Sequence, residues 1–135
     1  MDDTYNIRIN YQLNVLNKPL LSCNCNKTLN EKSKLTGIYR DGFCKTEKND
    51  FGLHTVCSII TDEFLEFSKS VSNNLSDPIP EYNFLEVSSG DLWCLYAESW
   101  KQSYFANKAL KVISESTNIL TLSEIEFRIL NKFSA

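Results

Sequence analysis

The chain has 135 residues, a length typical of one domain that buries roughly two-thirds of the surface its unfolded form exposes. Hydrophobic residues make up 42% and charged residues 23%, as in ordinary globular proteins, and the formal net charge is -3. This charge argues against nucleic-acid binding, which requires a basic face that neutralises phosphates. No stretch approaches the ~20 apolar residues of a membrane span, so we expect a soluble protein without a membrane partner.

The N-terminus is acidic and lacks the basic region and apolar core of a secretory signal, which predicts a cytoplasmic location. Because disulfides rarely persist in the cytosol, the cysteines are then expected to be mostly reduced thiols. There are five of them, and an odd number excludes a framework in which every cysteine is paired within the chain.

The first half of the chain is predicted to contain two strands separated by irregular structure. Residues 11–16 alternate between apolar and polar side chains, as in a half-buried strand. Residues 22–35 are rich in Asn, Ser and Lys and are expected to form an exposed insertion loop. Residues 36–48, with two glycines, read as an ordered, turn-rich segment. The β-branched run 54–61 predicts a strand that is buried on both faces.

A helix is predicted directly after that strand. Thr61 is a suitable N-cap, and the two acidic residues that follow it complement the positive end of the helix dipole. The helix is expected to end near residues 72–74. Residues 75–90 then form a long connection with two prolines, where helix is disfavoured; connections of this length tend to be functional or disordered.

The last third is predicted to hold two more helices and a short strand. Apolar residues recur at a helical spacing between Trp93 and Tyr104, which favours a helix that begins near residue 91 and places Trp93 and Trp100 in the core. A strand over 92–97 is the alternative. Residues 109–114 resemble a short strand, and 123–126 match the capping box of a final helix.

These elements predict one α+β domain over residues 1–135. It would be a small single-domain two-layer sandwich with a short mixed sheet and about three helices. The sequence motifs of nucleotide-binding loops, zinc proteases and serine hydrolases do not occur in it. Whether the protein is an enzyme therefore remains open, and no cofactor is predicted.

Candidate chemistry centres on the only histidine, His54, which could titrate near neutrality or instead be a structural residue at a strand end. Candidate metal ligands are Cys44, His54, Cys57 and Cys94, although no Cys-x-x-Cys knuckle is present. The alternative is that the cysteines are small core residues or redox groups. In a regular strand His54 and Cys57 point to opposite faces, which argues against a shared ion.

A second candidate region is the turn-rich segment with Arg40 and Asp41. Arg40 could bind an anion and Asp41 could act as a base, or both could belong to a fixed turn in which Gly42 allows a positive φ. Together with Asn73 and Asn74 from the end of the helix, these two residues form a candidate binding surface.

Four stretches form a specific combination. They read Thr-Gly-Ile-Tyr-Arg-Asp-Gly-Phe-Cys at 36–44, His-Thr-Val-Cys at 54–57, Thr-Asp-Glu-Phe-Leu-Glu-Phe-Ser-Lys-Ser at 61–70, and Gly-Asp-Leu-Trp-Cys at 90–94. With these motifs the segment 14–100 resembles a bacterial family catalogued as domain of unknown function 2237. The resemblance implies a small two-layer α/β sandwich and no particular activity, cofactor or partner. The motif matches include Arg40, Asp41, Cys44, His54, Cys57, Trp93 and Cys94.

Two functions are consistent with these observations. The first is a binding or accessory domain whose surface is formed by the turn 40–44 and the connection 73–90. The second is a small metal-binding or thiol-dependent enzyme centred on Cys44, His54 and Cys57, with Asp41 as a further catalytic candidate. The family often has Cys-Cys where this chain has Phe43-Cys44, so a mechanism that needs adjacent thiols does not transfer.

Overall fold

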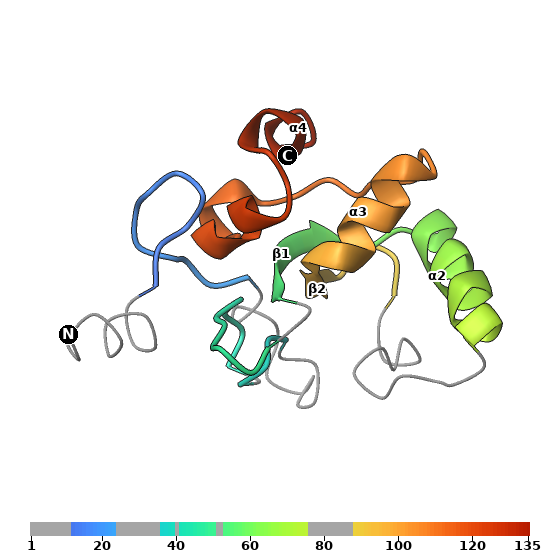
Figure 1. Ribbon diagram of the computed structural model, residues 1–135, viewed down its shortest axis with the longest axis horizontal. Coiled ribbons are helices and arrows are strands. Elements are labelled where there is room, and N and C mark those ends of the chain that lie inside the picture. The colour runs from blue at the N-terminus through green and yellow to red at the C-terminus, as the bar shows by residue number, and fades with distance from the viewer. Residues whose placement is uncertain (1–11, 24–35, 40, 51–52, 76–87) are drawn as a thin grey trace.

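The computed structural model describes residues 12–23, 36–39, 41–50, 53–75 and 88–135 (Figure 1). Its helices and strands are, in chain order, β1 (His54–Ile59), α2 (Asp62–Leu75), β2 (Leu92–Tyr96), α3 (Ala97–Phe105), the 3-10 helices η3 (Ser114–Ser116) and η4 (Ile119–Ser123), and α4 (Phe127–Asn131). Three α-helices and a two-stranded sheet in these residues confirm the predicted α+β class. None of the described helices is long and apolar enough to cross a membrane.

The sheet is an antiparallel pair at the centre of the molecule, with Cys57 opposite Cys94 and Ser58 opposite Trp93. The predicted strand 109–114 is reduced to Val112, which forms one antiparallel bridge to Ser58 and one parallel bridge to Ser134. The segment 11–16 likewise forms only isolated bridges where the structure describes it. Each of these segments forms only single-residue bridges, so the strands predicted from the sequence are longer than those in the structure.

The two faces of the sheet carry different clusters, because successive side chains of a strand point to opposite sides. On β2, Trp93 and Leu95 join the hydrophobic core, whereas Leu92 and Cys94 lie with the sulfur atoms. The rest of the buried core comes from β1, from the helices and from segments nearer both ends of the chain: Val15, Val56, Ile60, Phe64, Ala97, Trp100, Leu110, Val112, Ile125 and Leu130.

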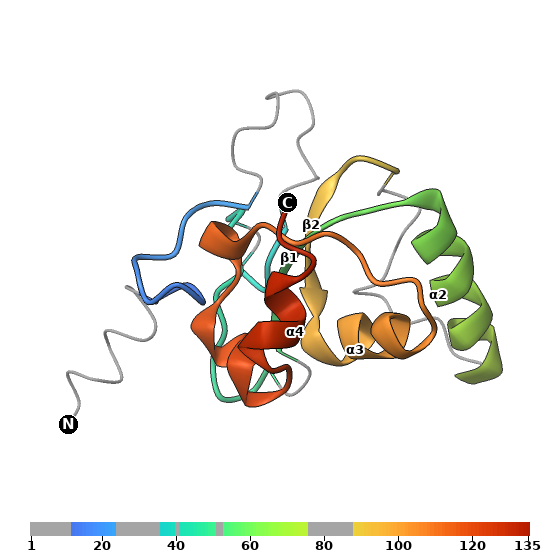
Figure 2. The ribbon, with the colours of Figure 1, turned by 90° about the horizontal axis from the view of Figure 1, so that it is seen from above.

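α2 begins where the sequence predicted. The backbone N–H of Phe64 donates to the Oγ1 of Thr61 at 3.1 Å, which is the expected N-cap bond. The helix lies at one end of the molecule in Figures 1 and 2, and Phe64 is its fully buried anchor. An ion pair at 3.0 Å between Glu63 and Lys108 ties its first turn to the chain that follows α3.

We expect Thr61→Ala to lower the free energy of unfolding by about 1 kcal/mol, because the first turn of α2 loses its cap. Thr61→Ser keeps the hydroxyl and should stay within a few tenths of a kcal/mol of the wild type. Urea denaturation followed by circular dichroism measures both. Equal stability of Thr61→Ala and the wild type would contradict the capping role.

The prediction of a helix from residue 91 is wrong for its first half. Residues 92–96 form β2, and the helix begins only at Ala97. Pairing with β1 supplies hydrogen bonds that outweigh the helical spacing of the tryptophans, since tertiary contacts readily override local pattern. Both tryptophans are nevertheless in the core, as predicted, and Trp100 donates its Nε1–H to the carbonyl of Leu110 at 3.1 Å.

The predicted capping box at 123–126 is also not formed. Residues 119–123 are a 3-10 helix that is capped by Asn118, whose side chain accepts from the N–H of Leu120 at 2.9 Å. α4 starts after Glu126 and has no side-chain cap in the described structure. Ile125 and Leu130 of this region are buried in the core.

Candidate functional site

The turn at Asp41 is held by its own side chain. The Oδ1 of Asp41 accepts from the N–H of Phe43 at 3.0 Å, and Lys45 pairs with the carboxylate at 3.1 Å. Gly37 has φ +96°, and a Cβ there would collide with the carbonyl of Phe43. Asp41 thus fixes a turn, which matches the structural interpretation of this residue. Arg40 lies outside the described residues.

Asn73 and Asn74, the other members of the predicted binding surface, lie in the last turn of α2. The connection that follows is outside the described residues from 76 to 87. The surface formed by Arg40, Asp41, Asn73 and Asn74 therefore stays a prediction. The insertion loop 22–35 also stays a prediction: Ser22 and Cys23 are described, Cys23 is buried, and residues 24–35 lie outside the described part.

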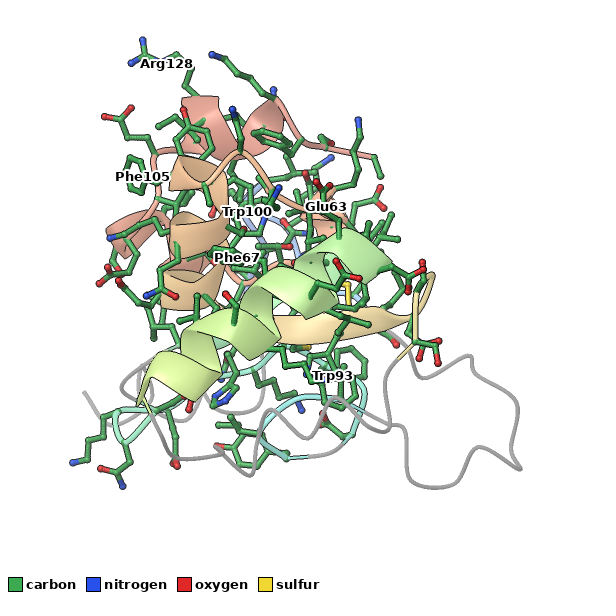
Figure 3. The ribbon with its side chains drawn as sticks, turned by 90° about the vertical axis from the view of Figure 1, so that its right-hand side faces the viewer. Glu63, Phe67, Trp93, Trp100, Phe105 and Arg128 are labelled. Carbon is green, nitrogen blue, oxygen red and sulfur yellow. A yellow bond between two sulfur atoms is a disulfide. The ribbon has the colours of Figure 1, made fainter. Side chains whose placement is uncertain are left out.

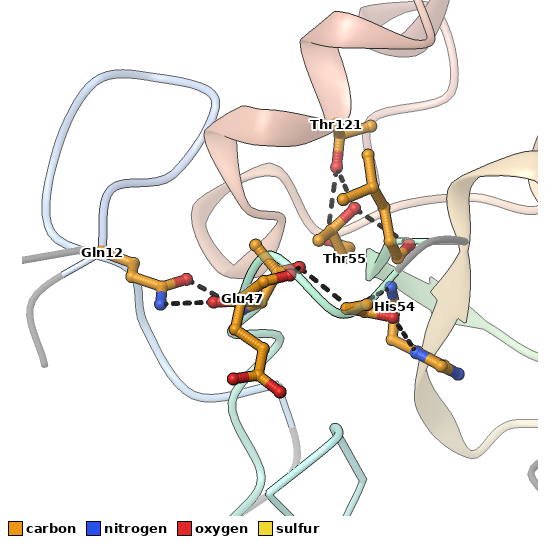
Figure 4. Close-up of polar contacts among 8 residues, drawn as sticks. Gln12, Glu47, His54, Thr55 and Thr121 are labelled. Atoms are coloured by element: carbon orange, nitrogen blue, oxygen red, sulfur yellow. Dashed lines mark hydrogen bonds and ion pairs between the residues drawn. The ribbon is translucent and has the colours of Figure 1, made fainter. Parts of the chain in front are cut away.

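His54 is held by a buried carboxylate that sequence reasoning missed. The Oδ1 of Asp50 lies 2.7 Å from the Nδ1 of His54, and its Oδ2 accepts from the backbone N–H of His54 at 2.9 Å (Figure 4). Thr46 donates its hydroxyl to the same Oδ2 at 3.0 Å. The signal was a carboxylate four residues before the only histidine, with Gly52 between them.

The Asp50 carboxylate is ionised at neutral pH. Burial raises its pKa, but the hydrogen bonds from the His54 ring and backbone, the charge of His54 and the Thr46 hydroxyl together lower that pKa below its ordinary value. An ionised carboxylate can only accept hydrogen bonds, so the Nδ1 of His54 must carry the proton. In the neutral ring, Nε2 is then the hydrogen-bond acceptor.

The Nε2 of His54 is buried and has no hydrogen-bond partner among the residues that the structure describes. The ring packs against Tyr96, with centroids 3.8 Å apart, and 17% of the His54 side chain is exposed. A buried acceptor without a partner costs free energy, and such atoms in native proteins require an explanation. The His54 ring is therefore oriented by Asp50 and packed against Tyr96, and its Nε2 has no partner among the described residues.

A β-bulge decides which face His54 occupies. His54 is opposite Tyr96 and Val56 is opposite Leu95, so Thr55 is the extra residue on β1. Tyr96 shares a face of β2 with Cys94, and the His54 ring stacks on Tyr96. His54 therefore lies on the sulfur-containing face, which corrects the expectation that it points away from Cys57.

The bulged residue is anchored from the C-terminal third of the chain. The hydroxyl of Thr121 in η4 donates to the hydroxyl of Thr55 at 2.7 Å (Figure 4). The backbone N–H of Asn118 donates to the carbonyl of Thr55 at 2.9 Å. These contacts link residues more than sixty positions apart in the sequence. The face of His54 is thus set by tertiary contacts and could not be predicted from the strand alone.

Four of the cysteines form two disulfides, Cys23–Cys57 and Cys44–Cys94, and all four residues are buried. The prediction of mostly reduced thiols therefore does not describe this structure. Cys44 and Cys57 hold no free thiolate that could act as a nucleophile while they are paired. Cys23 was not among the predicted site residues, and Cys25 lies outside the described part of the chain.

The sulfur atoms of Cys23, Cys44 and Cys57 all lie within 4.8 Å of one another. Among the residues that the structure describes, His54 does not belong to this group. Of the predicted set, Cys44 and Cys57 belong to this group, and Cys94 is joined to it through its disulfide with Cys44. The imidazole of His54 is instead bonded to Asp50.

A buried network of hydrogen bonds connects the segment around Asp50, which holds His54, with the backbone of the disulfide-bonded Cys44. The side chain of Gln12 donates to the carbonyl of Thr46 at 2.9 Å and accepts from its N–H at 3.0 Å (Figure 4). The Nδ2 of Asn118 donates to Gln12 at 2.6 Å and to the carbonyl of Cys44 at 3.0 Å. The segment that supplies Thr46 and Asp50 to His54 is therefore fixed from both ends of the chain.

These features define a small α+β domain with two buried disulfides on one face of its sheet and a carboxylate-oriented histidine beside them. No curated protein sequence matches the chain. The family model described as an uncharacterised protein conserved in bacteria, domain of unknown function 2237, matches residues 13–134. The chain belongs to this family, as its sequence motifs indicate.

We expect Asp50→Asn to be about 2 kcal/mol less stable than the wild type near neutral pH, because buried charge-assisted hydrogen bonds contribute about 1.5–3 kcal/mol. The pKa of Asp50 is lower in the folded state than in the unfolded chain. Its contribution is therefore complete above the unfolded pKa of about 3.9 and is lost as the pH falls through the folded value.

Urea denaturation of both proteins between neutral pH and about pH 2 measures this difference. The two stability curves should converge in acid. A constant gap across the whole range would show that the ionisation of Asp50 is not the cause.

Proposed function

We propose that this protein is a binding domain whose site is centred on His54, and that the bound group is a hydroxyl or amide N–H. The observation that carries the proposal is the buried Nε2, which has no partner in the described residues while Nδ1 is bonded to Asp50. In the neutral ring protonated at Nδ1, this Nε2 accepts a hydrogen bond. The carboxylate sets the tautomer and Tyr96 restricts the ring, so little ordering is needed when a donor binds.

Binding is favoured over thiol-dependent catalysis because the predicted nucleophiles, Cys44 and Cys57, are paired in buried disulfides. A carboxylate-oriented histidine is also found where a histidine acts as a general base, but that chemistry needs a nucleophile or a substrate proton within reach. The metal-binding or thiol-dependent alternative would therefore operate only after reduction of the sulfur cluster.

The turn 40–44 and the connection 73–90 are proposed to complete the binding surface, with contacts from Arg40, Asp41, Asn73 and Asn74. The half-exposed ion pair of Asp41 and Lys45 supports this proposal, because it belongs to the same short segment that leads to Asp50. A net charge of -3 favours a protein or small-molecule ligand over nucleic acid.

A cytoplasmic location is also a proposal. It requires that the two disulfides be reduced in the cell, since cytosolic thiols are kept reduced. Rapid alkylation of the cysteines in cells, followed by mass spectrometry, tests it. Fully alkylated cysteines would agree with the cytoplasm, and protected pairs would place the protein in an oxidising compartment.

The binding proposal can be tested by NMR, because the single imidazole gives one unambiguous pair of ring ¹⁵N resonances. In the free protein we expect the pattern of a ring protonated at Nδ1. A fragment library of alcohols, phenols and amides should contain members that shift the Nε2 resonance. His54→Asn keeps a donor for Asp50 but removes Nε2, and it should weaken such binding by up to about tenfold.

His54→Gln is the matched control, since its amide oxygen can replace the Nε2 acceptor. Recovery of part of the affinity in this variant would support a direct hydrogen bond. A library in which every member leaves the Nε2 resonance unchanged would count against a ligand site at His54, as would equal affinities for the wild type and His54→Asn.

A further inference from the structure

We infer that Cys23, Cys44, Cys57 and Cys94 form a second site, which binds a thiophilic metal ion such as Zn²⁺ once the two disulfides are reduced. The inference does not depend on the proposed ligand site, because His54 is not one of the four residues. In this reduced state the four cysteines would be joined by coordinate bonds to one ion, in place of the two disulfides.

The spacing of the sulfur atoms suits a tetrahedral ion. With Zn–S bonds of about 2.3 Å, the ligand atoms of a tetrahedral site lie about 3.8 Å apart. The sulfurs of Cys23, Cys44 and Cys57 already lie within 4.8 Å of one another in the oxidised structure. Cys94 is outside this group, but it is bonded to Cys44 and is the register partner of Cys57. We therefore assign it as the fourth ligand.

The four backbone positions are held by contacts other than the disulfides. The N–H of Cys23 donates to the carbonyl of Gly42 at 2.6 Å, and the carbonyl of Cys44 accepts from Asn118 at 3.0 Å. On the two strands, the N–H of Cys57 donates to the hydroxyl of Thr117 at 3.1 Å, and that of Cys94 donates to the hydroxyl of Thr36 at 2.8 Å. These bonds bring the four thiols together in the folded state, which a bound ion would stabilise after reduction.

The site also has the burial that structural metal sites share. Cys44 and Cys57 are fully buried, and Cys23 and Cys94 are 4% and 1% exposed. Leu92 and Ile113 pack against the cluster. The ligands come from four separate segments, so one ion would join the same parts of the chain as the two disulfides.

The conversion requires a reductant, for which a dithiol is the chemical class. Each protein disulfide accepts two electrons and two protons and becomes two thiols, while the dithiol loses them and closes to its own disulfide. Two dithiol molecules therefore yield four cysteine thiols. Each thiol that coordinates the ion then releases its proton to solvent, because the thiolate is the ligand.

The experiment uses the full chain, reduced with dithiothreitol and desalted without oxygen. We expect it to retain about one Zn²⁺ per chain through a second desalting step, and Co²⁺ to give the charge-transfer and ligand-field bands of tetrahedral thiolate coordination. The oxidised chain should bind neither ion. Failure of the reduced wild type to bind either ion would overturn the inference.

Residue assignment rests first on the reduced wild type, because variants of the buried cysteines could fail to fold. In the reduced wild type, Zn²⁺ should protect four cysteines from alkylation while Cys25 is modified, as peptide mapping can show. Cys25→Ser and His54→Asn should bind the metal like the wild type, whereas Cys44→Ser and Cys57→Ser should lose it. Protection of Cys25, or loss of metal in His54→Asn, would sink the assignment.

Discussion

Reduction of both disulfides without added metal is expected to lower the free energy of unfolding by between about 4 and 8 kcal/mol. The two bridges span 34 and 50 residues. Loops of that size each contribute about 4 kcal/mol when the bridge restricts the unfolded chain. The closed segments overlap between residues 44 and 57, so the two contributions are not independent and their combined effect is smaller than the sum.

A loss of this size is comparable to the whole stability of a typical domain, about 5–15 kcal/mol. Much of the reduced, metal-free chain is therefore expected to be unfolded under conditions where the oxidised chain is folded. The regular sheet in the described residues has only two strands, and an isolated strand pair is marginally stable in water. The disulfides compensate by tying both strands to the segments around Cys23 and Cys44.

The measurement is urea denaturation of the oxidised and reduced wild type beside two paired variants. Cys23→Ala with Cys57→Ala removes one bridge without leaving an unpaired thiol, and Cys44→Ala with Cys94→Ala removes the other. Cys25→Ala is the control and should match the wild type. Losses below about 1 kcal/mol in both paired variants would contradict the crosslinking role assigned to the cluster.

The parts of the fold that the sequence predicted are those with short-range signals. The β-branched run that forms β1, the cap at Thr61 and the acidic first turn of α2 all lie within about ten residues of one another. Each signal is a property of neighbouring side chains. No distant contact is needed to interpret it, and the structure agrees with it.

The sequence-based predictions are wrong where an element is stabilised by residues far away in the sequence. The helical spacing of Trp93 and Trp100 favours a helix over β2, but the strand conformation of this segment depends on β1, some forty residues earlier. The cap of η4 is Asn118, which also binds Gln12 more than a hundred positions away. Asn118 is buried and held by these hydrogen bonds, so the helical turn begins there and not at the capping box predicted for residues 123–126.

In the candidate site, too, the residues with a local sequence signal were predictable and those defined by distant contacts were not. His54 was identifiable as the only histidine, and Cys44, Cys57 and Cys94 were identifiable from motifs. Cys23 was not, because its partner Cys57 is defined only by the fold. The face occupied by His54 depends on the bulge at Thr55, which Thr121 and Asn118 hold in place. A strand pattern alone contains no information about such an insertion.

Trp100→Ala should be the most destabilising single substitution in the hydrophobic core, with an expected cost of about 3–5 kcal/mol. The side chain is fully buried, its ring stacks on Tyr104 with centroids 5.8 Å apart, and its edge contacts Phe133. Its Nε1–H bonds to the carbonyl of Leu110. Removal of the indole would leave a cavity where α3 meets the C-terminal segments, and that carbonyl would lose its donor.

Two matched variants separate these causes. Trp100→Phe retains much of the packing but loses the hydrogen bond, so it should be clearly less damaging than Trp100→Ala. Phe105→Ala, on the same helix, removes a ring that is 79% exposed and should change stability by no more than about 0.5 kcal/mol (Figure 3). Thermal and urea denaturation of the three variants give the comparison. If Phe105→Ala were as harmful as Trp100→Ala, the core would have to lie on the opposite face of α3.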